Sequence, residues 1–482
     1  MKKIFSLILT LCLFILILST PISVSAQETA ELPAPQKVVY VLAAPFTTLT
    51  DEVSFADFQK FWSGSDYVFD RFPTDEITVI ASDQPSFVSQ FGETNVNRVT
   101  FETEFMVATG QAVRLEKWLI LPFDQLDARF KVIAIDGQNP LHHEFDADQW
   151  PLTLRLNGTE SMTEADWSAI QPSNRDPEKL TNIMMTGVTA LVRAVEGYMY
   201  VWGTEYPATN IGDTLRAADI LHINNEIPFA PNCSQTDEEL DRLVFCSKPE
   251  RLELLTSIGT DVIELAGDHF QDYGDSAVYY TLDLYDDAGI PYYGGGRTLE
   301  EAQKPLLIEH NGNKFAFLGC NAKEIGYAVA SETRPGAAHC DLSLLTAQIK
   351  DAKAAGYMPI VTFQHIEYYR VSPNEEMRES FNAAVDAGAV ITSGSQSHIP
   401  MAFSINKKSF THFGLGNLFF DQAFYLPETG EATLDRHVFY NNRHISTEVL
   451  TIKFINNALS RFMTKDERTA MLERIFNEST IQ

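Results

Sequence analysis

Residues 254–274 have the sequence LLTSIGTDVIELAGDHFQDYG, and this stretch decides the fold class. It begins within a helix-like segment, residues 249–258, and continues into residues 261–266, an apolar run typical of a buried strand. Polar residues follow at once, among them Asp268 and His269. A helix, a buried strand and a polar loop in this order are typical of an α/β domain, in which the strand ends carry the chemistry.

The same alternation extends in both directions, from about residue 179 to about residue 421. Further strands are expected at residues 219–223, 315–319, 359–363 and 389–392, with helices at residues 342–355 and 374–386. Five segments place polar groups directly after an apolar, strand-like stretch. These are Asn224, Asn225 and Glu226; Asp268, His269 and Asp272; His365 and Glu367; Gln396 and His398; and Asn417 and Asp421.

The residue types in these groups indicate a metal site. Histidines and carboxylates that converge from separate strands are how hydrolases assemble a divalent metal centre. Each group alone has a simpler interpretation, because Asn-Glu after a strand is usual in turns and an Asp-His pair often makes only a loop hydrogen bond. Metal-binding histidines and structural, hydrogen-bonded histidines both remain open at this point.

A smaller α/β lobe is expected before this domain, over residues 37–178, with the main domain over residues 179–430. In the lobe, residues 38–42 have a buried-strand pattern, and Ser54 is placed to cap a helix with an apolar face. Residues 431–482 are expected to form a C-terminal extension packed on the core. Its last helix has the capping-box residues Thr464 and Glu467.

The N-terminus has the features of a secretory signal peptide over residues 1–26. Lys2 and Lys3 precede an apolar core, residues 4–18, which is short for a membrane span. Residues 27–36 form a Pro-rich linker. We therefore expect a secreted or extracytoplasmic protein with no stable transmembrane span after cleavage. The alternative is a membrane anchor formed by an uncleaved N-terminal segment.

The charge of the chain limits its partners. It has 65 acidic and 36 basic side chains, which give a formal net charge of −29. A protein this acidic repels phosphate backbones, so nucleic acid is excluded as a main partner.

Four cysteines follow the signal peptide: Cys233, Cys246, Cys320 and Cys340. An even number in an oxidising compartment suggests two disulfides, for which three connectivities exist. The local pairing, Cys233 with Cys246 and Cys320 with Cys340, closes two short loops and is the one we predict. The alternative is four buried free thiols.

Residues from about 186 to 421 resemble the CapA family, the poly-γ-glutamate or capsule biosynthesis proteins of bacteria. The matching stretches stand in the family's order. They are ADILHINNEIPF (218–229), the opening stretch (254–274), DDAGIPYYGGGRTLEEAQKP (286–305), FQHIEYYRVSP (363–373), AVDAGAVITSGSQSHIPM (384–401) and THFGLGNLFFDQ (411–422). The resemblance implies a four-layer α/β/β/α sandwich of the calcineurin-like metallophosphatase type. In the lobe, residues 118–126 are similar to part of the type 2 periplasmic solute-binding proteins.

The chain departs from the family pattern at two metal-binding positions. Val188 stands where the family has an aspartate, and Gln396 replaces one histidine of the Gly-x-His-x-His motif. Valine cannot bind a cation and a neutral amide is a weak ligand, so the family's full binuclear centre is not expected. The retained residues imply a site for one divalent metal ion of unspecified identity.

The resemblance implies three roles at this site. The metal ligands are Glu226, Asp268 and His398. The general acid or base residues are His269 and His365, because histidine titrates near neutrality. The substrate-binding residues are Asn225, Asp272, Glu367, Arg297 and Asn417.

Two functions follow as hypotheses. The first is an extracytoplasmic CapA-like protein in capsule, poly-γ-glutamate or cell-surface polymer metabolism, acting as a metal-dependent hydrolase or transferase with a partly degenerate site. The second is a non-catalytic protein that binds a ligand or polymer. In both, the partner is a cell-surface polymer or a small anionic ligand. The retained ligands favour the first hypothesis, and the two replaced positions favour the second.

Overall fold

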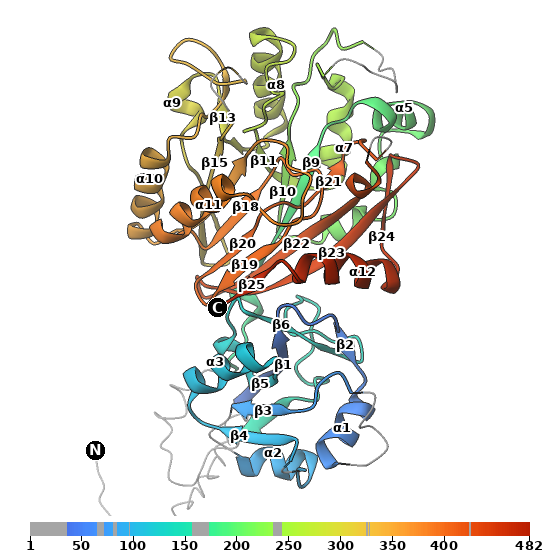
Figure 1. Cartoon of the computed structure of the whole chain (residues 1–482), viewed down its shortest axis with the longest axis vertical. Helices are drawn as coiled ribbons and strands as arrows, with labels where there is room; N and C mark the ends of the chain where they lie inside the picture. The colour runs from blue at the N-terminus through green and yellow to red at the C-terminus, as the bar shows by residue number, and fades with distance from the viewer. Residues whose placement is uncertain are drawn as a thin grey trace, which may run out of the picture.

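The computed structural model describes residues 36–64, 72–80, 84–95, 97–156, 173–234, 243–323, 326, 328–423 and 426–482. The predicted signal peptide, and all but the last residue of the predicted linker, lie outside these residues. A large domain and a smaller N-terminal lobe lie end to end along the long axis of the molecule (Figure 1). Within the described ranges, no helix is both long and apolar enough to cross a membrane.

The first sheet of the large domain has eight strands, with β9 (Leu180–Thr189) near its centre. β9 pairs in parallel with β10 (Ile220–Asn225), and β10 pairs in parallel with β11 (Thr260–Glu264). On its other side, β9 pairs antiparallel with β22 (Glu431–Tyr440). The remaining strands of this sheet are β12 (Tyr292–Tyr293), β21 (Asn417–Phe419), β23 (His444–Ile455) and β24 (Leu459–Phe462).

The second sheet has seven strands in the order β14, β15, β17, β18, β20, β19, β25. The four strands from β15 to β20 in this order run parallel to one another. The strands are β14 (Leu306–His310), β15 (Asn313–Asn321), β17 (Met358–Gln364), β18 (Ile391–Gly394), β20 (Ser409–His412), β19 (Phe403–Asn406) and β25 (Thr480–Ile481). A separate short pair joins β13 (Gly295–Gly296) to β16 (Gly336–Ala337).

The two sheets pack face to face through apolar side chains such as Met185 of β9 and Phe317 of β15. Helices cover the outer face of each sheet (Figure 1). On the first sheet these are α5 (Arg193–Trp202), α6 (Gly212–Arg216), α7 (Leu252–Ser257) and α8 (Asp275–Ala288). On the second they are α9 (Leu299–Ala302), α10 (Leu342–Ala354) and α11 (Glu375–Ala387). This order of layers confirms the predicted four-layer α/β/β/α class.

Local sequence sets the ends of several helices. The Asp341 side chain accepts from the backbone at the start of α10, and Asn374 does the same for α11. Gly388 ends α11 at φ 119°, in the left-handed region that favours glycine.

The N-terminal lobe has a six-stranded sheet with β1 (Gln36–Pro45) inside it. The other strands are β3 (Ile77–Ile80), β4 (Val99–Glu102), β5 (Trp118–Pro122), β6 (Phe130–Val132) and β8 (Thr153–Leu156). Its helices are α1 (Phe55–Ser63), α2 (Gln84–Phe91) and α3 (Phe105–Leu115), and β2 (Glu52–Val53) pairs with β7 (Ala134–Ile135). Ser54 caps α1 by accepting from the Asp57 backbone, as its spacing predicts. The likeness of the lobe to solute-binding proteins stays a prediction.

The C-terminal residues differ from the extension that the sequence led us to expect. β22, β23 and β24 complete the first sheet and β25 completes the second, so the segment is part of both sheets rather than an added layer. The reason is pairing: β22 takes the free edge of β9 along most of its length. The predicted capping box of α12 (Lys465–Phe476) is present, formed by Thr464 and Glu467.

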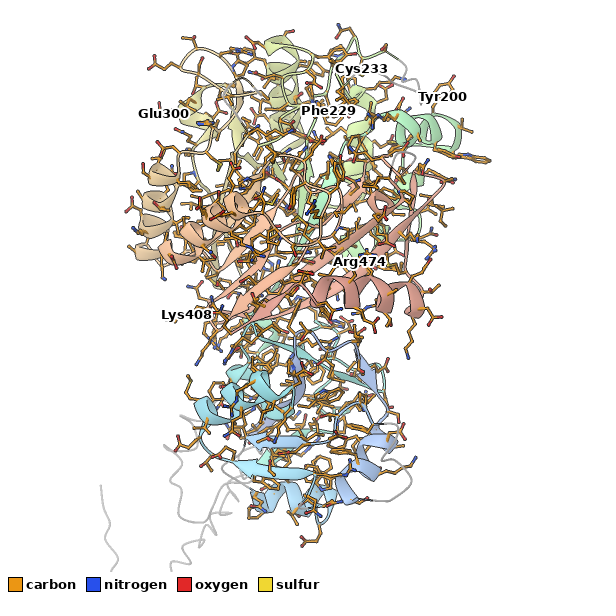
Figure 2. The ribbon with its side chains drawn as sticks, viewed as in Figure 1. Tyr200, Phe229, Cys233, Glu300, Lys408 and Arg474 are labelled. Atoms are coloured by element: carbon orange, nitrogen blue, oxygen red, sulfur yellow. A yellow bond between two sulfur atoms is a disulfide. The ribbon has the colours of Figure 1, made fainter. Side chains whose placement is uncertain are left out.

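Charged contacts join the lobe to these C-terminal elements. Lys131 and Arg468 both contact Asp51, and Glu448 pairs with both His142 and Arg436. The turn between β19 and β20, with Lys408 labelled in Figure 2, lies beside the lobe, and α12 carries the labelled Arg474. The lobe is therefore held by ion pairs as well as by apolar packing that includes Leu180 and Tyr440.

Both predicted disulfides are confirmed. Cys233 is bonded to Cys246 and Cys320 to Cys340. Figure 2 shows Cys233 at the end of the large domain opposite the lobe. The second bond joins the end of β15 to the segment before α10, close to the strand ends that carry the candidate site.

His222, one of several buried histidines, should contribute to the acid sensitivity of the fold. Burial lowers the pKa of His222 to about 3, and its ring stacks on Phe317 and contacts the Tyr293 hydroxyl. Between about pH 6.5 and 3, this histidine binds a proton in the unfolded chain but not in the folded chain. Its contribution to the free energy of unfolding is therefore complete above pH 6.5 and is lost as the pH falls. At pH 5 this one histidine should cost about 2 kcal/mol of unfolding free energy.

The measurement is thermal unfolding of the wild type and His222→Phe at pH 7 and pH 5. The phenylalanine keeps the ring but cannot titrate, so the variant should lose less stability between the two pH values, even if it is less stable at pH 7. An equal loss in both proteins would show that His222 does not govern the acid sensitivity.

Candidate metal centre

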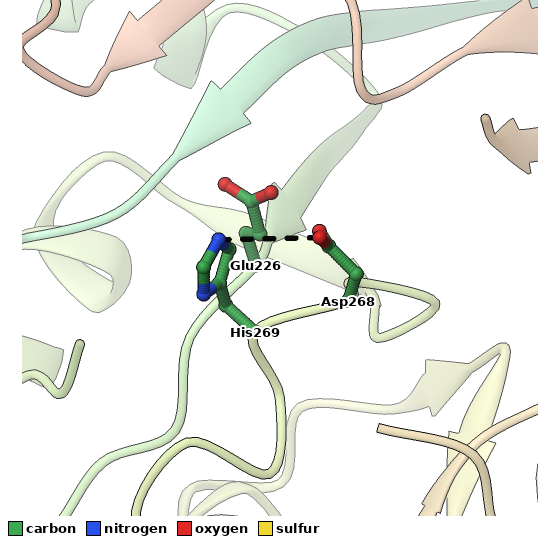
Figure 3. A group of neighbouring side chains, drawn as sticks. All are labelled: Glu226, Asp268 and His269. Carbon is green, nitrogen blue, oxygen red and sulfur yellow. Dashed lines mark ion pairs between the residues drawn. The ribbon is translucent and has the colours of Figure 1, made fainter. Parts of the chain in front are cut away.

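Glu226, Asp268 and His269 come together at one edge of the first sheet (Figure 3). Glu226 directly follows β10, and the other two lie in the loop after β11. One ligand atom from each residue lies within 4.8 Å of the other two. Because the two strands are parallel neighbours, their carboxyl ends meet at the same edge and deliver these side chains to one place.

Gly267 permits this approach. A Cβ atom at this position would lie 2.6 Å from the backbone oxygen of Glu226. Any larger residue would therefore push the two loops apart. The glycine before Asp268 is needed for the cluster to close.

Glu226 is the most buried member of the cluster, with 1% of its surface exposed. Its Oε1 accepts from Gln364 Nε2 at 3.2 Å, and among the described residues its Oε2 has no hydrogen-bond partner. Burial raises the pKa of Glu226 well above its ordinary value, and the Asp268 carboxylate raises it further. Burial and Asp268 therefore both favour the neutral form of Glu226.

Asp268 has the opposite character. Its Oδ1 accepts from Gln364 Nε2 at 3.0 Å, and its Oδ2 is in contact with the Lys323 ammonium. Burial raises the pKa of Asp268, but the charges of His269 and Lys323 outweigh burial and bring the pKa below its ordinary value. Asp268 is the ionised carboxylate of the pair.

His269 is oriented by Asp272. Its Nδ1 lies 2.7 Å from Asp272 Oδ2, which also accepts from the Phe245 backbone at 2.7 Å. This leaves Nε2 facing the cluster, 3.9 Å from Asp268 Oδ2. A carboxylate behind a histidine in this way is the usual support of a metal-binding imidazole. Burial lowers the pKa of His269, but the hydrogen bond to Asp272 and the nearby carboxylates raise it to about 9.

A hydrogen-bonded network that the sequence reasoning missed lies behind the cluster. Gln364 Nε2 contacts Glu226, Asp268 and also Gln396 Oε1. Ser395 Oγ lies 3.0 Å from Gln364 Oε1 and 3.1 Å from Glu264 Oε1. Burial raises the pKa of Glu264 to about 7. Gln364 directly precedes His365, and Ser395 directly precedes Gln396. This adjacency to predicted site residues was the one sign in the sequence that could have indicated them.

The structure does not bring His365 into the cluster. Its ring stacks on Phe381 of α11 with centroids 5.9 Å apart, and neither ring nitrogen has a partner among the described residues. Burial lowers the pKa of His365 to about 4. Successive side chains of a strand point to opposite faces, so at the end of β17 Gln364 faces the cluster and His365 faces the helix.

His398, Glu367 and Asn417 form a second group. His398 Nδ1 lies 2.9 Å from Asn417 Oδ1, and its Nε2 lies 3.8 Å from Glu367 Oε1. The hydrogen bond to His398 lowers the pKa of Glu367 to about 2, against burial, which raises it. Three predicted site residues thus contact one another. Among the described residues, His398 is not part of the group formed by Glu226, Asp268 and His269.

Two predicted substrate-binding residues are engaged elsewhere. The Asn225 amide donates to the Ile227 carbonyl and the Tyr285 hydroxyl, both at 2.8 Å. Arg297 forms ion pairs with three carboxylates on and near α8 and α9, those of Asp283, Asp286 and Glu301. These contacts give Asn225 and Arg297 structural roles.

Val188 is the residue that we expected in place of the family's aspartate. It is fully buried in an apolar group with Phe245 and Phe420, beside Asn417 of β21. An ion could gain no ligand there. Gln396 points to Gln364 instead of to a cation. The retained residues therefore suit one ion and not two.

The hydrogen bond from His269 to Asp272 should keep the imidazole charged at neutral pH. A pKa near 9 exceeds the unfolded value of 6.5, so the contribution of this pair to stability is complete below pH 6.5 and is lost as the pH rises through 9. In Asp272→Asn the pKa of His269 should fall toward its ordinary value. Histidine NMR titration of both proteins measures this, and an unchanged titration would show that Asp272 is not the cause.

Comparison with known proteins identifies the chain's relatives. Residues 177–422 match the model of the family described as bacterial capsule synthesis protein PGA_cap. The chain is 28% identical over 315 residues to the capsule biosynthesis protein CapA of Bacillus anthracis, a match covering 62% of this chain and 76% of that protein. It is 26% identical over 212 residues to the PGA biosynthesis protein CapA of Bacillus subtilis, which covers 43% of this chain and 55% of the relative.

Solved structures resemble the chain only distantly. The 5′-nucleotidase precursor from Thermus thermophilus has 11% identity and a TM-score of 0.35, covering 61% of this chain and 58% of that one. The NAD nucleotidase of Haemophilus influenzae has 8% identity and a TM-score of 0.34, covering 63% and 57%. At such scores the likeness supports no functional conclusion. The family match spans about half of the chain and includes the whole cluster. This chain therefore belongs to the bacterial capsule synthesis protein family PGA_cap.

Proposed function

We propose that this chain acts outside the cytoplasm in the synthesis of a bacterial surface polymer, as a metal-dependent hydrolase or transferase. The family and the names of its Bacillus relatives support a role in capsule or poly-γ-glutamate synthesis. The two disulfides support an oxidising compartment. The bond acted on is an amide or phosphoester of the polymer or its precursor.

One observation carries this proposal: the donor set of Glu226, Asp268 and His269. Two carboxylate oxygens and one imidazole nitrogen within 4.8 Å of one another suit a divalent ion, and three protein ligands are typical of a catalytic site with an open position. Glu226 Oε2 supports this, because it has no hydrogen-bond partner among the described residues and such a buried atom is costly unless a further ligand satisfies it.

The residues of the chain have separate tasks at such a site. A bound divalent ion would lower the pKa of a water molecule and polarise the bond to be broken. His269 would hold the ion through Nε2, and Asp272 keeps that ring in place by accepting from Nδ1. Glu226 and Asp268 would hold it through carboxylate oxygens, and Gln364 Nε2 orients both carboxyl groups by donating to each.

Electrostatics restrict how a polyanion could reach this site. The net charge of −29 repels such a polymer at long range, but screening at physiological salt limits that repulsion to about 8 Å. His269 and Lys323 supply positive charge within the cluster itself. Binding should therefore strengthen with salt at low ionic strength and depend on contacts close to the cluster.

A non-catalytic polymer-binding function is the second candidate. Val188 and Gln396 favour it, because they remove two ligands of the family's pattern. The depth of Glu226 also favours it, since a substrate must reach a nearly closed site.

Metal binding should depend on the cluster and not on His365. After chelator treatment, calorimetric titration of the wild type with Mn²⁺ or Zn²⁺ should show one site per chain. Glu226→Gln and His269→Ala should weaken binding by about tenfold or more, as loss of one of three ligands does. His365→Gln should leave the affinity unchanged, because that ring faces α11. A loss in His365→Gln equal to that in Glu226→Gln would contradict the assigned site.

Catalysis and binding can be separated with poly-γ-glutamate. With the metal that binds, the wild type should shorten the polymer or transfer its segments, as seen by gel electrophoresis of chain length, and Glu226→Gln should do neither. If the wild type retains the polymer in a pull-down experiment but leaves its length unchanged, the binding function is the correct one.

A further inference from the structure

Lys323 follows a strand of the second sheet and contacts Asp268 of the cluster. Among the described residues, it is the one cation that the second sheet brings to the cluster. It stands two positions after β15, where its backbone N–H donates to Asn321 Oδ1 at 2.9 Å. Its side chain is 13% exposed and the Asp268 side chain that it contacts is 3% exposed. Burial lowers the pKa of Lys323, but Asp268 outweighs burial and the pKa is raised, so the ammonium stays charged.

The two oxygens of Asp268 are used differently. Oδ1 accepts from Gln364. Oδ2 faces His269 Nε2 and is also the oxygen that Lys323 contacts. Lys323 therefore contacts the Asp268 oxygen that faces the candidate ligand His269.

Both aspartates of this region have a basic partner in this structure. Asp268 Oδ2 contacts the Lys323 ammonium, and Asp272 Oδ2 lies 2.7 Å from His269 Nδ1. Adding a divalent ion through Asp268 Oδ2 would place two cations on one oxygen in a buried site, where repulsion is screened little. The ammonium must leave before the oxygen can ligate.

We propose that Lys323 is a tethered counter-cation that occupies Asp268 Oδ2 in the metal-free protein and competes with the divalent ion for that oxygen. The inference rests on the proposed metal site and adds a residue that sets its affinity. The competition makes the site bind metal more weakly than its three ligands alone would. It also keeps Asp268 from being a buried, unpaired charge when no metal is bound.

The test compares Lys323→Met with Lys323→Arg in the full mature chain. Methionine keeps an unbranched side chain of similar length without the charge, and arginine keeps the charge. After chelator treatment, calorimetric titration with Mn²⁺ and Zn²⁺ should show binding about tenfold tighter or more in Lys323→Met than in the wild type. Lys323→Arg should bind no more tightly than the wild type.

Thermal unfolding gives a second readout that needs no activity. In chelator, Lys323→Met should melt at a lower temperature than the wild type, because Asp268 loses its cation. Adding Asp268→Asn to Lys323→Met should recover part of that loss. Mn²⁺ should raise the melting temperature of Lys323→Met by more than that of the wild type, because a tighter ligand stabilises the folded state more. If Lys323→Met does not fold, Lys323→Gln replaces it.

The outcomes separate this inference from the proposed function. If the wild type binds metal through Glu226 and Lys323→Met binds it equally or more weakly, the competition is refuted and the metal site stands. If neither protein nor variant binds either ion, the metal site and the competition both fall. Tighter binding in Lys323→Arg as well would show that the charge of Lys323 is not what opposes the ion.

Discussion

The parallel pairing of β10 with β11 is the constraint on which the site depends. Their register, with Asn224 opposite Glu264, brings the two following loops to one edge, and Gly267 lets those loops touch. The second sheet then packs face to face on the first, so that the end of β17 delivers Gln364 to the same place. If that register slipped by one residue, each strand would turn its side chains to the other face and the cluster would disperse.

Burial gives the cluster its chemistry by separating two neighbouring carboxyl groups. Glu226 and Asp268 sit side by side in a site with little water, where both cannot easily be ionised. His269 and Lys323 stand near Asp268 and favour its charged form, whereas the far oxygen of Glu226 meets no donor among the described residues. The surroundings thus push the pKa values of the two carboxyl groups apart, up for Glu226 and down for Asp268.

The departures from the family's ligand pattern are accommodated by the packing around them. Val188 joins an apolar group with Phe245 and Phe420, and the Phe245 ring also contacts His269 with centroids 4.8 Å apart. Gln396 accepts from Gln364, so the amide pair fills space with neutral hydrogen bonds. Apolar and amide groups therefore fill the two positions at which we expected the chain to depart from the family.

The sequence by itself predicted an α/β domain, the place of several strands along the chain and the pairing of the cysteines. These depend on local patterns: apolar runs followed by polar residues, capping residues such as Ser54 and Thr464, and short loops between cysteines. It also placed Glu226, Asp268, His269 and Asp272 together, because neighbouring parallel strands share an edge. Only the tertiary structure decided that Gln364 and not His365 faces the cluster, and that Lys323 reaches Asp268. It also decided that residues 431–482 complete both sheets. These outcomes depend on which face a side chain takes at a strand end and on contacts between residues far apart in the chain, and no local pattern encodes either.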